Sequence, residues 1–288
     1  MNKRKIDIIL EKIDYLPPFP ATVSKTLELL NKKDVSIDSV ADSIKFDPSL
    51  TSNILRLCNS SYFSLKRTIS NINEALVYVG LSQLRKMLMM TGTKFFYDKK
   101  QEGYEAARGE LWKHSLSVSI ISEIINKKIK TSETDSVFVA GLLHDIGKLV
   151  LSEFVIEEAG KIEEMVENDK ISFLEAEGKL FSTNHAELGG RILKMWNFDP
   201  SIVSAVSKHH TPMISDDSNL DNIIRLADSF SIMIGYGTSI DGLAYIGFSE
   251  ICKLYGLCSS VIDNILSESV EEIKNVESEF RITGEDIY

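Results

Sequence analysis

Residues 139–150 read VAGLLHDIGKLV, an apolar run that carries two adjacent polar residues, His144 and Asp145. The Val, Ala, Leu and Ile around them indicate a buried helix, and a buried charge is costly unless it is paired or bound to metal. The pair is therefore either satisfied locally or held by a polar partner from elsewhere in the chain. Lys148, four residues after His144, adds a positive charge to the same stretch.

Helical periodicity dominates the rest of the chain, and no segment shows the alternation of a strand. Ser36 and Asp47-Pro48 are predicted to cap two helices, Ser70 to open another that Gly80 closes, and Ser82 to open the next. Further apolar stripes cover residues 111–127, 135–152, 155–168, 184–196, 200–209, 219–235 and about 260–280. The sequence predicts an all-α fold, with an N-terminal helical lobe (residues 1–104) packed on a helical core lobe (105–288). The polar segment 98–110 is the expected seam between them.

The bulk composition excludes several classes of protein. The chain is 43% hydrophobic and 26% charged, as in folded globular domains, and its net charge of −10 argues against a general nucleic-acid-binding surface. No uninterrupted apolar run approaches the roughly 18 residues of a membrane span, and no secretory signal is recognisable. The three cysteines form no CxxC pair, which favours reduced thiols in a cytoplasmic protein.

The five histidines lie beside other residues that bind metals. Glu110 and His114 are spaced i, i+4, so they share one helix face; the alternative is a solvent-exposed contact between the two. His185 follows the predicted cap Asn184. The remaining candidates are His209, His210 and Asp228, the first two at a helix end before Pro212 and the third on an apolar stripe. Two protonated histidines at a helix C-terminus, and an ion pair of Asp228 with Arg225, are the structural alternatives.

Together these residues offer imidazoles and carboxylates from several helices, which is how helical bundles build metal sites. Nitrogen and oxygen ligands from His and Asp suit Fe, Mn, Zn or Ni, and the share of carboxylates favours Fe or Mn. Two such divalent ions around one shared carboxylate suit phosphoryl chemistry. The sequence therefore predicts a divalent metal centre with two or more ions.

The order His114, His144-Asp145, Asp228 resembles the H…HD…D signature of the HD superfamily of metal-dependent phosphohydrolases. More specifically, the chain resembles the HDOD (HD-related output domain) family of bacterial signalling proteins over roughly residues 10–240. The matching segments are LPPFPATVSKTLELL (16–30), FDPSLTSNILRLCNSSYFS (46–64), ISNINEALVYVGLSQLRKML (69–88), GLLHDIGKLVL (141–151), NHAELGGRILKMW (184–196) and VSKHHTP (206–212).

This resemblance implies a regulatory module related to the HD-GYP cyclic di-GMP phosphodiesterases. It implies that Asp145 bridges two metals, one bound by His114, His144 and Asp228. The other is then bound by His185, His209 and His210, Glu110 completes a further site, and Lys148 contacts phosphate. The chain departs from the HD-GYP pattern after His210, where it reads TPMISDDSN (211–219) in place of the GYP segment.

Two functions follow as expectations. The first is a signalling or regulatory HDOD protein with a metal centre and a protein partner. The alternative is an active metal-dependent phosphohydrolase or phosphodiesterase with Asp145 and Lys148 as catalytic residues and a cyclic dinucleotide, another nucleotide or a phosphate as its ligand. Redox or oxygen sensing through a di-iron centre fits the same ligands. Neither a nucleic-acid partner nor a membrane is expected.

Overall fold

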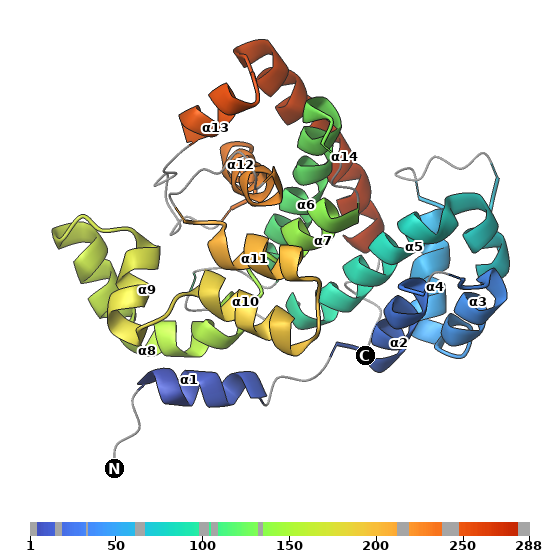
Figure 1. The fold of residues 1–288 in the computed structure, drawn as a ribbon, viewed down its shortest axis with the longest axis horizontal. Helices are drawn as coiled ribbons and strands as arrows, with labels where there is room; N and C mark the ends of the chain where they lie inside the picture. Colours follow the sequence, from blue (N-terminus) through green and yellow to red (C-terminus); the bar gives the residue numbers. More distant parts are fainter. Residues whose placement is uncertain are drawn as a thin grey trace. The chain divides into compact units, whose positions relative to one another are not determined.

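The structure is a computed structural model that describes residues 5–14, 19–32, 34–60, 67–97, 104, 109–131, 135–211, 219–237 and 248–281. These residues form fourteen helices and no strand, so the predicted all-α fold is confirmed (Figure 1). The helices are α1 (Lys5–Asp14), α2 (Ala21–Leu30), α3 (Ile37–Ile44), α4 (Pro48–Cys58), α5 (Ile72–Tyr97), α6 (Glu110–Ile129), α7 (Asp135–Leu143), α8 (Lys148–Asn168), α9 (Phe173–Phe181), α10 (His185–Met195), α11 (Pro200–Lys208), α12 (Asn219–Met233), α13 (Phe248–Leu254) and α14 (Ser259–Arg281).

The chain divides into two compact units. Unit 1 comprises Met1–Pro17 and Phe96–Ser267, and unit 2 comprises Pro18–Phe95 and Glu268–Tyr288. Helix α1 therefore belongs to the same unit as the histidines, and the end of α14 belongs to the unit of α2 to α5. The expected lobes, residues 1–104 and 105–288, are contiguous in sequence, whereas both compact units are discontinuous. The lobe boundary itself stays a prediction.

The helix starts of unit 2 follow from local capping. The Ser36 hydroxyl accepts a hydrogen bond from Ser39 N at 3.2 Å, and the Asp47 carboxylate accepts one from Leu50 N at 2.9 Å, as their positions before α3 and α4 predict. At the start of α5 the capping side chain is Asn71, which accepts from Glu74 N at 2.9 Å. Gly80, at φ +78°, interrupts α5 where the sequence predicts a helix end.

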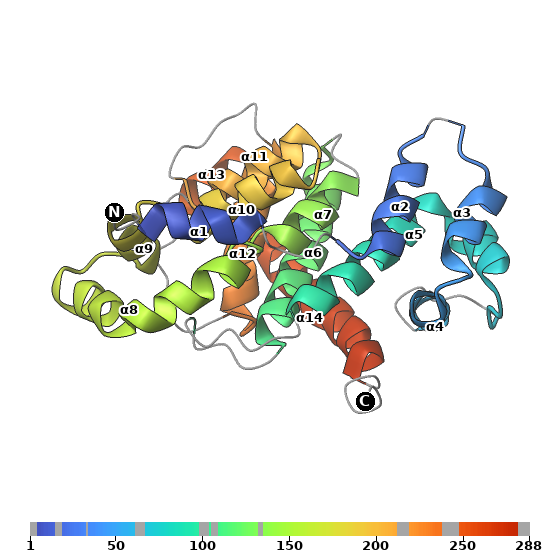
Figure 2. The same ribbon diagram turned by 90° about the horizontal axis from the view of Figure 1, so that it is seen from below.

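Unit 1 is organised around α6, α7, α11 and α12, which pack against one another, with α10 against α11 (Figures 1 and 2). Helix α1 lies along α8, where Lys5 pairs with Glu158 and Lys12 with Glu153. No described helix is both long enough and apolar enough to cross a membrane.

The stripe predicted over 135–152 is broken in the structure. Helix α7 ends at Leu143 and α8 begins at Lys148, so His144 and Asp145 lie in a turn and not within a helix. The turn is closed by hydrogen bonds of i→i+3 type, from Ile146 N to Leu143 O at 3.0 Å and from Lys148 N to Asp145 O at 2.9 Å. The apolar stripe alone cannot distinguish such a tight turn from a continued helix.

Gly147 explains why the turn lies where it does. A Cβ atom on Gly147 would lie 1.9 Å from the carbonyl oxygen of His185 and 2.7 Å from Gly189 N. The turn after α7 therefore approaches the first turn of α10 more closely than any side chain permits. This contact brings the His144-Asp145 pair next to His185.

Candidate metal centre

The candidate ligands come together from five segments of unit 1. His114 lies on α6, His144 and Asp145 in the turn between α7 and α8, His185 at the first position of α10, His209 and His210 directly after α11, and Asp228 on α12. Six of these seven side chains are buried, with exposed fractions between 0 and 4%, and His210 is half-buried. Residues separated by more than 100 positions thus form one buried polar cluster.

Asp145 lies at the centre of this cluster. Its Oδ2 atom lies 3.4 Å from His144 Nε2 and 3.6 Å from His114 Nε2. Its Oδ1 atom lies 3.5 Å from His185 Nε2 and 3.8 Å from His209 Nε2. The two oxygens of one carboxylate therefore face two different sets of imidazoles.

Two compact groups of potential ligands result among the described residues. We call His114, His144 and Asp228, with Asp145 Oδ2, the His114 group; Asp228 Oδ1 lies 3.2 Å from His114 Nε2. We call His185, His209 and His210, with Asp145 Oδ1, the His185 group. The potential ligand atoms of His114, His144 and Asp145 lie within 4.8 Å of one another. The same holds for the ligand atoms of His185, His209 and His210.

The outer nitrogens of four imidazoles fix the orientation of the rings. In three of them Nδ1 donates to a backbone carbonyl: His114 to Tyr236 O at 2.7 Å, His144 to Gly141 O at 2.8 Å and His209 to Val206 O at 2.7 Å. In the fourth, His185 Nδ1 donates to the carboxylate of Glu177 (Oε2) at 2.9 Å. A carbonyl or carboxylate oxygen only accepts, so Nδ1 carries the proton and Nε2 of the neutral ring presents a lone pair. This is the arrangement found behind metal-bound histidines.

Several inward-facing atoms of the cluster are acceptors that no protein donor satisfies. His114 Nε2 lies 3.2 Å from His144 Nε2, and His185 Nε2 lies 3.1 Å from His210 Nε2. Asp145 Oδ1 and Nε2 of His209 are buried and have no hydrogen-bond partner among the described residues, whereas Asp145 Oδ2 faces the Lys148 ammonium at 2.9 Å. Buried acceptors are normally satisfied, and divalent cations satisfy this combination of nitrogen and carboxylate ligands. The donor set therefore fits divalent metal ions.

The electrostatics of the cluster keep Asp145 ionised. Burial by itself would raise the pKa of Asp145, but the charges of His144 and Lys148 outweigh it and hold that pKa well below the ordinary value. Lys148 Nζ lies 2.9 Å from Asp145 Oδ2, and both side chains are at most 1% exposed. Lys148, predicted to contact phosphate, is thus an ion-pair partner of the central carboxylate in this structure.

The pKa of His209 is lowered to about 3 by burial and by the neighbouring His144 and His185. The imidazole is therefore neutral at physiological pH, which argues against two protonated histidines at the end of α11. Burial would also lower the pKa values of His144 and His185. In His144 the charges of Asp145 and Asp228 prevail, and in His185 that of Glu177, so both pKa values are raised.

Two expected partners lie elsewhere. Glu110 pairs with Lys113 at 2.5 Å and belongs to neither group of candidate ligands, so its role at a further site stays a prediction. Arg225, the alternative partner of Asp228, donates instead to the carbonyl oxygens of Lys208 and His209, each at 3.3 Å. Arg225 thereby holds the end of α11, where His209 and His210 follow.

Two buried residues beside His185, Glu177 and Tyr104, were not predicted from the sequence. Glu177 lies on α9, is 0% exposed and binds both the backbone and the imidazole of His185; Tyr104 donates to it at 2.5 Å. A signal for Glu177 was present, because it shares an apolar helix stripe with Phe173, Ala176 and Phe181. The same criterion had identified Asp228. Tyr104 lies in the polar segment 98–110 and carries no such signal.

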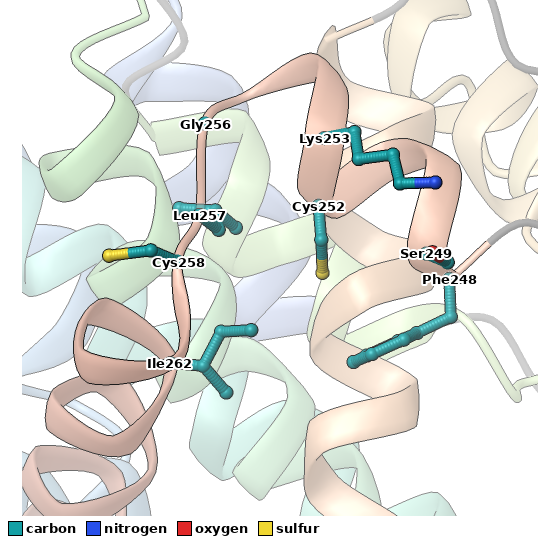
Figure 3. A pocket seen from close by; sticks show the side chains of 8 residues that line it. All are labelled: Phe248, Ser249, Cys252, Lys253, Gly256, Leu257, Cys258 and Ile262. Carbon is teal, nitrogen blue, oxygen red and sulfur yellow. The ribbon is translucent and has the colours of Figure 1, made fainter.

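Unit 1 also contains a pocket of about 470 Å³ at the turn between α13 and α14 (Figure 3). Leu257 N donates to Cys252 O at 2.8 Å and Gly256, at φ +63°, ends α13, so the turn is a helix C-cap. The buried Cys252 sulfur points among Phe248, Leu257 and Ile262, whereas the exposed Cys258 sulfur points away. All three cysteines of the chain are free, and the pocket is lined by none of the candidate ligands.

Comparisons with known proteins agree with this architecture. Residues 16–212 match the HDOD domain family. An HDOD domain protein with unknown function from Geobacter sulfurreducens superposes with a TM-score of 0.74 at 26% identity, over 96% of this chain and 98% of that one.

Two relatives in sequence are longer proteins. An uncharacterized protein of Treponema pallidum is 23% identical over 76% of this chain and 44% of its own length. The 3'3'-cGAMP-specific phosphodiesterase 3 of Vibrio cholerae is 28% identical over 41% of this chain and 26% of its own length. The chain thus spans less than half the length of these relatives.

Proposed function

The chain belongs to the HDOD domain family, and on this premise we propose that it is a bacterial signalling module whose helical core holds divalent cations in a solvent-shielded centre. The observation that carries this proposal is the burial of the ligands: Asp145, His185 and His209 are 0% exposed. A substrate must reach a catalytic metal, whereas a structural or regulatory metal needs no such access. The module then acts on a protein partner in a signalling pathway.

In this proposal two ions share Asp145. The His114 group holds one and the His185 group the other, and Glu110 remains a candidate for a further ion. The mixture of imidazole and carboxylate ligands favours Fe or Mn over Zn or Ni. A bound pair of ions would fix five segments of unit 1 to one another, which is how such a centre stabilises a regulatory surface.

The alternative is a metal-dependent phosphohydrolase acting on a cyclic dinucleotide or another nucleotide. Its support is Lys148, whose ammonium lies 2.9 Å from Asp145 and has the charge to contact a phosphate group. His210 is half-buried and so leaves one edge of the His185 group accessible. The partial likeness to a 3'3'-cGAMP-specific phosphodiesterase also supports this alternative. When bound, the cations would supply Lewis-acid stabilisation of charge on a phosphoryl group.

The test has two steps. Protein purified without chelator is analysed for Fe, Mn, Zn and Ni, and about two ions per chain are expected in the wild type and fewer in Asp145→Ala. The loaded protein is then assayed with cyclic dinucleotides and a generic phosphodiester. Absence of turnover with full metal content supports the regulatory module, and turnover lost in Asp145→Ala supports the phosphohydrolase. A wild-type protein that binds none of these metals contradicts both.

A further inference from the structure

The carboxylate of Glu177 is buried in a way that requires a reason. It lies on α9 and is 0% exposed, among apolar neighbours of the same helix. Its oxygens accept hydrogen bonds from His185 N at 2.9 Å, His185 Nδ1 at 2.9 Å and the Tyr104 hydroxyl at 2.5 Å. Three donors around one buried carboxylate are the environment of an ionised group. Glu177 therefore places a negative charge directly behind His185.

This arrangement distinguishes His185 from the other oriented histidines. The Nδ1 atoms of His114, His144 and His209 donate to neutral backbone carbonyls. His185 donates to a carboxylate, and the same carboxylate also holds its backbone N–H at the start of α10. Glu177 thus fixes both the position of the main chain and the rotation of the ring, with Nε2 directed towards Asp145 Oδ1 at 3.5 Å.

The charges of the two groups differ in a matching way. The His114 group contains Asp228 as a carboxylate of its own, in addition to its share of Asp145. The His185 group consists of three imidazoles and the other oxygen of Asp145, so its own side chains carry no further negative charge. The positive charge of a cation bound there is less well compensated, unless a carboxylate lies directly behind one of the histidine ligands. Glu177 occupies that place.

Tyr104 completes the arrangement. It is 0% exposed, its ring packs against Phe173 of α9 at 5.4 Å between centroids, and Lys148 Nζ lies 5.3 Å above the ring. The hydroxyl therefore reaches Glu177 from a fixed position and leaves Oε2 to His185.

We propose that Glu177, held by Tyr104, is the positioning residue of the His185 group: it fixes His185 with its Nε2 lone pair towards Asp145 and supplies the negative charge that this group lacks. The inference rests on the proposed metal centre for its consequence, but the orientation of His185 is a property of the metal-free protein. Loss of Glu177 should weaken one cation and leave the other in place.

The test compares Glu177→Gln with Glu187→Gln, which removes a carboxylate from the exposed face of the first turn of α10. Binding is measured by titrating the metal-free proteins with Co²⁺. In Glu177→Gln we expect about 10- to 100-fold weaker binding of one Co²⁺, the usual loss for a partner behind a ligating histidine, and little change in the other. Glu187→Gln should match the wild type. Equal affinities in all three proteins would overturn the inference.

A second measurement needs no metal. Nitrogen-15 NMR of the histidine rings in the chelated protein should show His185 protonated on Nδ1 in the wild type and in Glu187→Gln. In Glu177→Gln one carboxylate oxygen becomes an amide NH2 group that can donate to Nδ1, so His185 protonated on Nε2 should appear. A His185 tautomer that is unchanged in Glu177→Gln contradicts the positioning role, whereas a wild type that binds no Co²⁺ contradicts the proposed metal centre.

Should Glu177→Gln fail to fold, Tyr104→Phe provides the same comparison with a smaller perturbation, because it removes one hydrogen bond and keeps the ring. We expect a few-fold loss of affinity for one Co²⁺ and a changed nitrogen-15 shift at His185 alone. An unchanged shift together with unchanged affinity would overturn the proposal.

Discussion

Several buried hydroxyl groups of unit 2 are satisfied by nearby backbone carbonyls, whereas the buried polar side chains of the candidate metal centre in unit 1 converge from distant segments. In unit 2 the hydroxyls of Thr26, Ser60 and Thr93 donate to carbonyls three or four residues earlier. In unit 1 His114, Asp145 and His185 come from three segments and direct acceptors at one another. Local hydrogen bonding stabilises a helix wherever it forms, but convergent acceptors are stable only in a complete site.

This difference separates two roles of burial. The core of unit 2 is mainly apolar and gains most of its free energy from packing, and residues 18–95 contain no histidine. The centre of unit 1 keeps ionised and lone-pair-bearing groups away from water at a cost that an apolar core would avoid. Such a cost is typical of a functional site, and variants of the two regions should therefore respond differently to metal.

The largest effect is expected for Asp145→Ala. It removes the carboxylate that lies 2.9 Å from the buried Lys148 ammonium, and breaking a buried ion pair typically costs about 3–5 kcal/mol of unfolding free energy. The same change removes the ligand shared by both groups, so metal content should fall in both. Urea unfolding of the chelated protein measures the first effect and elemental analysis the second.

The matched control for this variant is Asp42→Asn on α3. Asp42 forms an exposed ion pair with Lys45, and such pairs contribute less than about 1 kcal/mol. A destabilisation as small in Asp145→Ala as in Asp42→Asn would show that the central carboxylate is not electrostatically coupled to its surroundings.

The next effect tests the apolar region. Leu57→Ala on α4 removes a side chain that is 1% exposed, and the resulting cavity should cost about 3 kcal/mol. Because no candidate ligand lies in residues 18–95, the loss should be the same with and without chelator, and metal content should be that of the wild type. Unfolding curves under both conditions measure it; a loss that depends on chelator would contradict the separation of the two regions.

A smaller effect concerns pH. Asp145 and Asp228 raise the pKa of His144 above its ordinary 6.5, and Glu177 does the same for His185, in both cases against the effect of burial. A ring with a raised pKa still holds its proton where a free imidazole has lost it, and a cation must displace that proton. As the pH is lowered, metal affinity should therefore begin to fall while the pH is still above 6.5. Below that point it should decline by up to about tenfold per pH unit for each displaced proton.

His209 should not contribute to this decline, because its pKa of about 3 leaves it neutral throughout that range. Titrations with Co²⁺ between about pH 8 and pH 6 measure the slope. An affinity that is constant over this range would mean that neither His144 nor His185 competes for protons, in contradiction to the charges that surround them.

The sequence predicts those features that depend on neighbours within a few residues. The helix after Asp47-Pro48, the interruption at Gly80 and the start of α10 after Asn184 all follow from capping residues, and each is present in the structure. The all-α class follows from the same patterns. The turn at 144–147 does not, because its cause is the contact of Gly147 with His185, some 40 positions away in the sequence.

The residues of the candidate site could be predicted where a charged side chain stands among apolar ones, because such a combination is rare. Asp145 and Asp228 stand out because a carboxylate on an apolar stripe needs a partner, and Glu177 met the same criterion. Arg225 was the alternative partner that its spacing from Asp228 suggested, but tertiary packing directs its guanidinium to the end of α11. Which atoms face one another depends on packing between helices, which no local pattern encodes.

The smallest effect provides the sharpest comparison, because a helix-capping side chain is replaced by Ala in each region. Asn184 caps α10 by accepting from Glu187 N at 2.9 Å, and Asp47 caps α4 by accepting from Leu50 N at 2.9 Å. Replacing either by Ala should cost about 1 kcal/mol of unfolding free energy.

Only the loss of the Asn184 cap should also weaken metal binding, because His185 is the first residue of α10 and moves when the first turn frays. Thermal unfolding measures the first quantity and Co²⁺ titration the second. If both variants lose the same stability but only the Asn184 variant binds metal more weakly, the cap of α10 positions a metal ligand and the cap of α4 does not. If both variants bind metal equally well, Glu177 alone holds His185 in place.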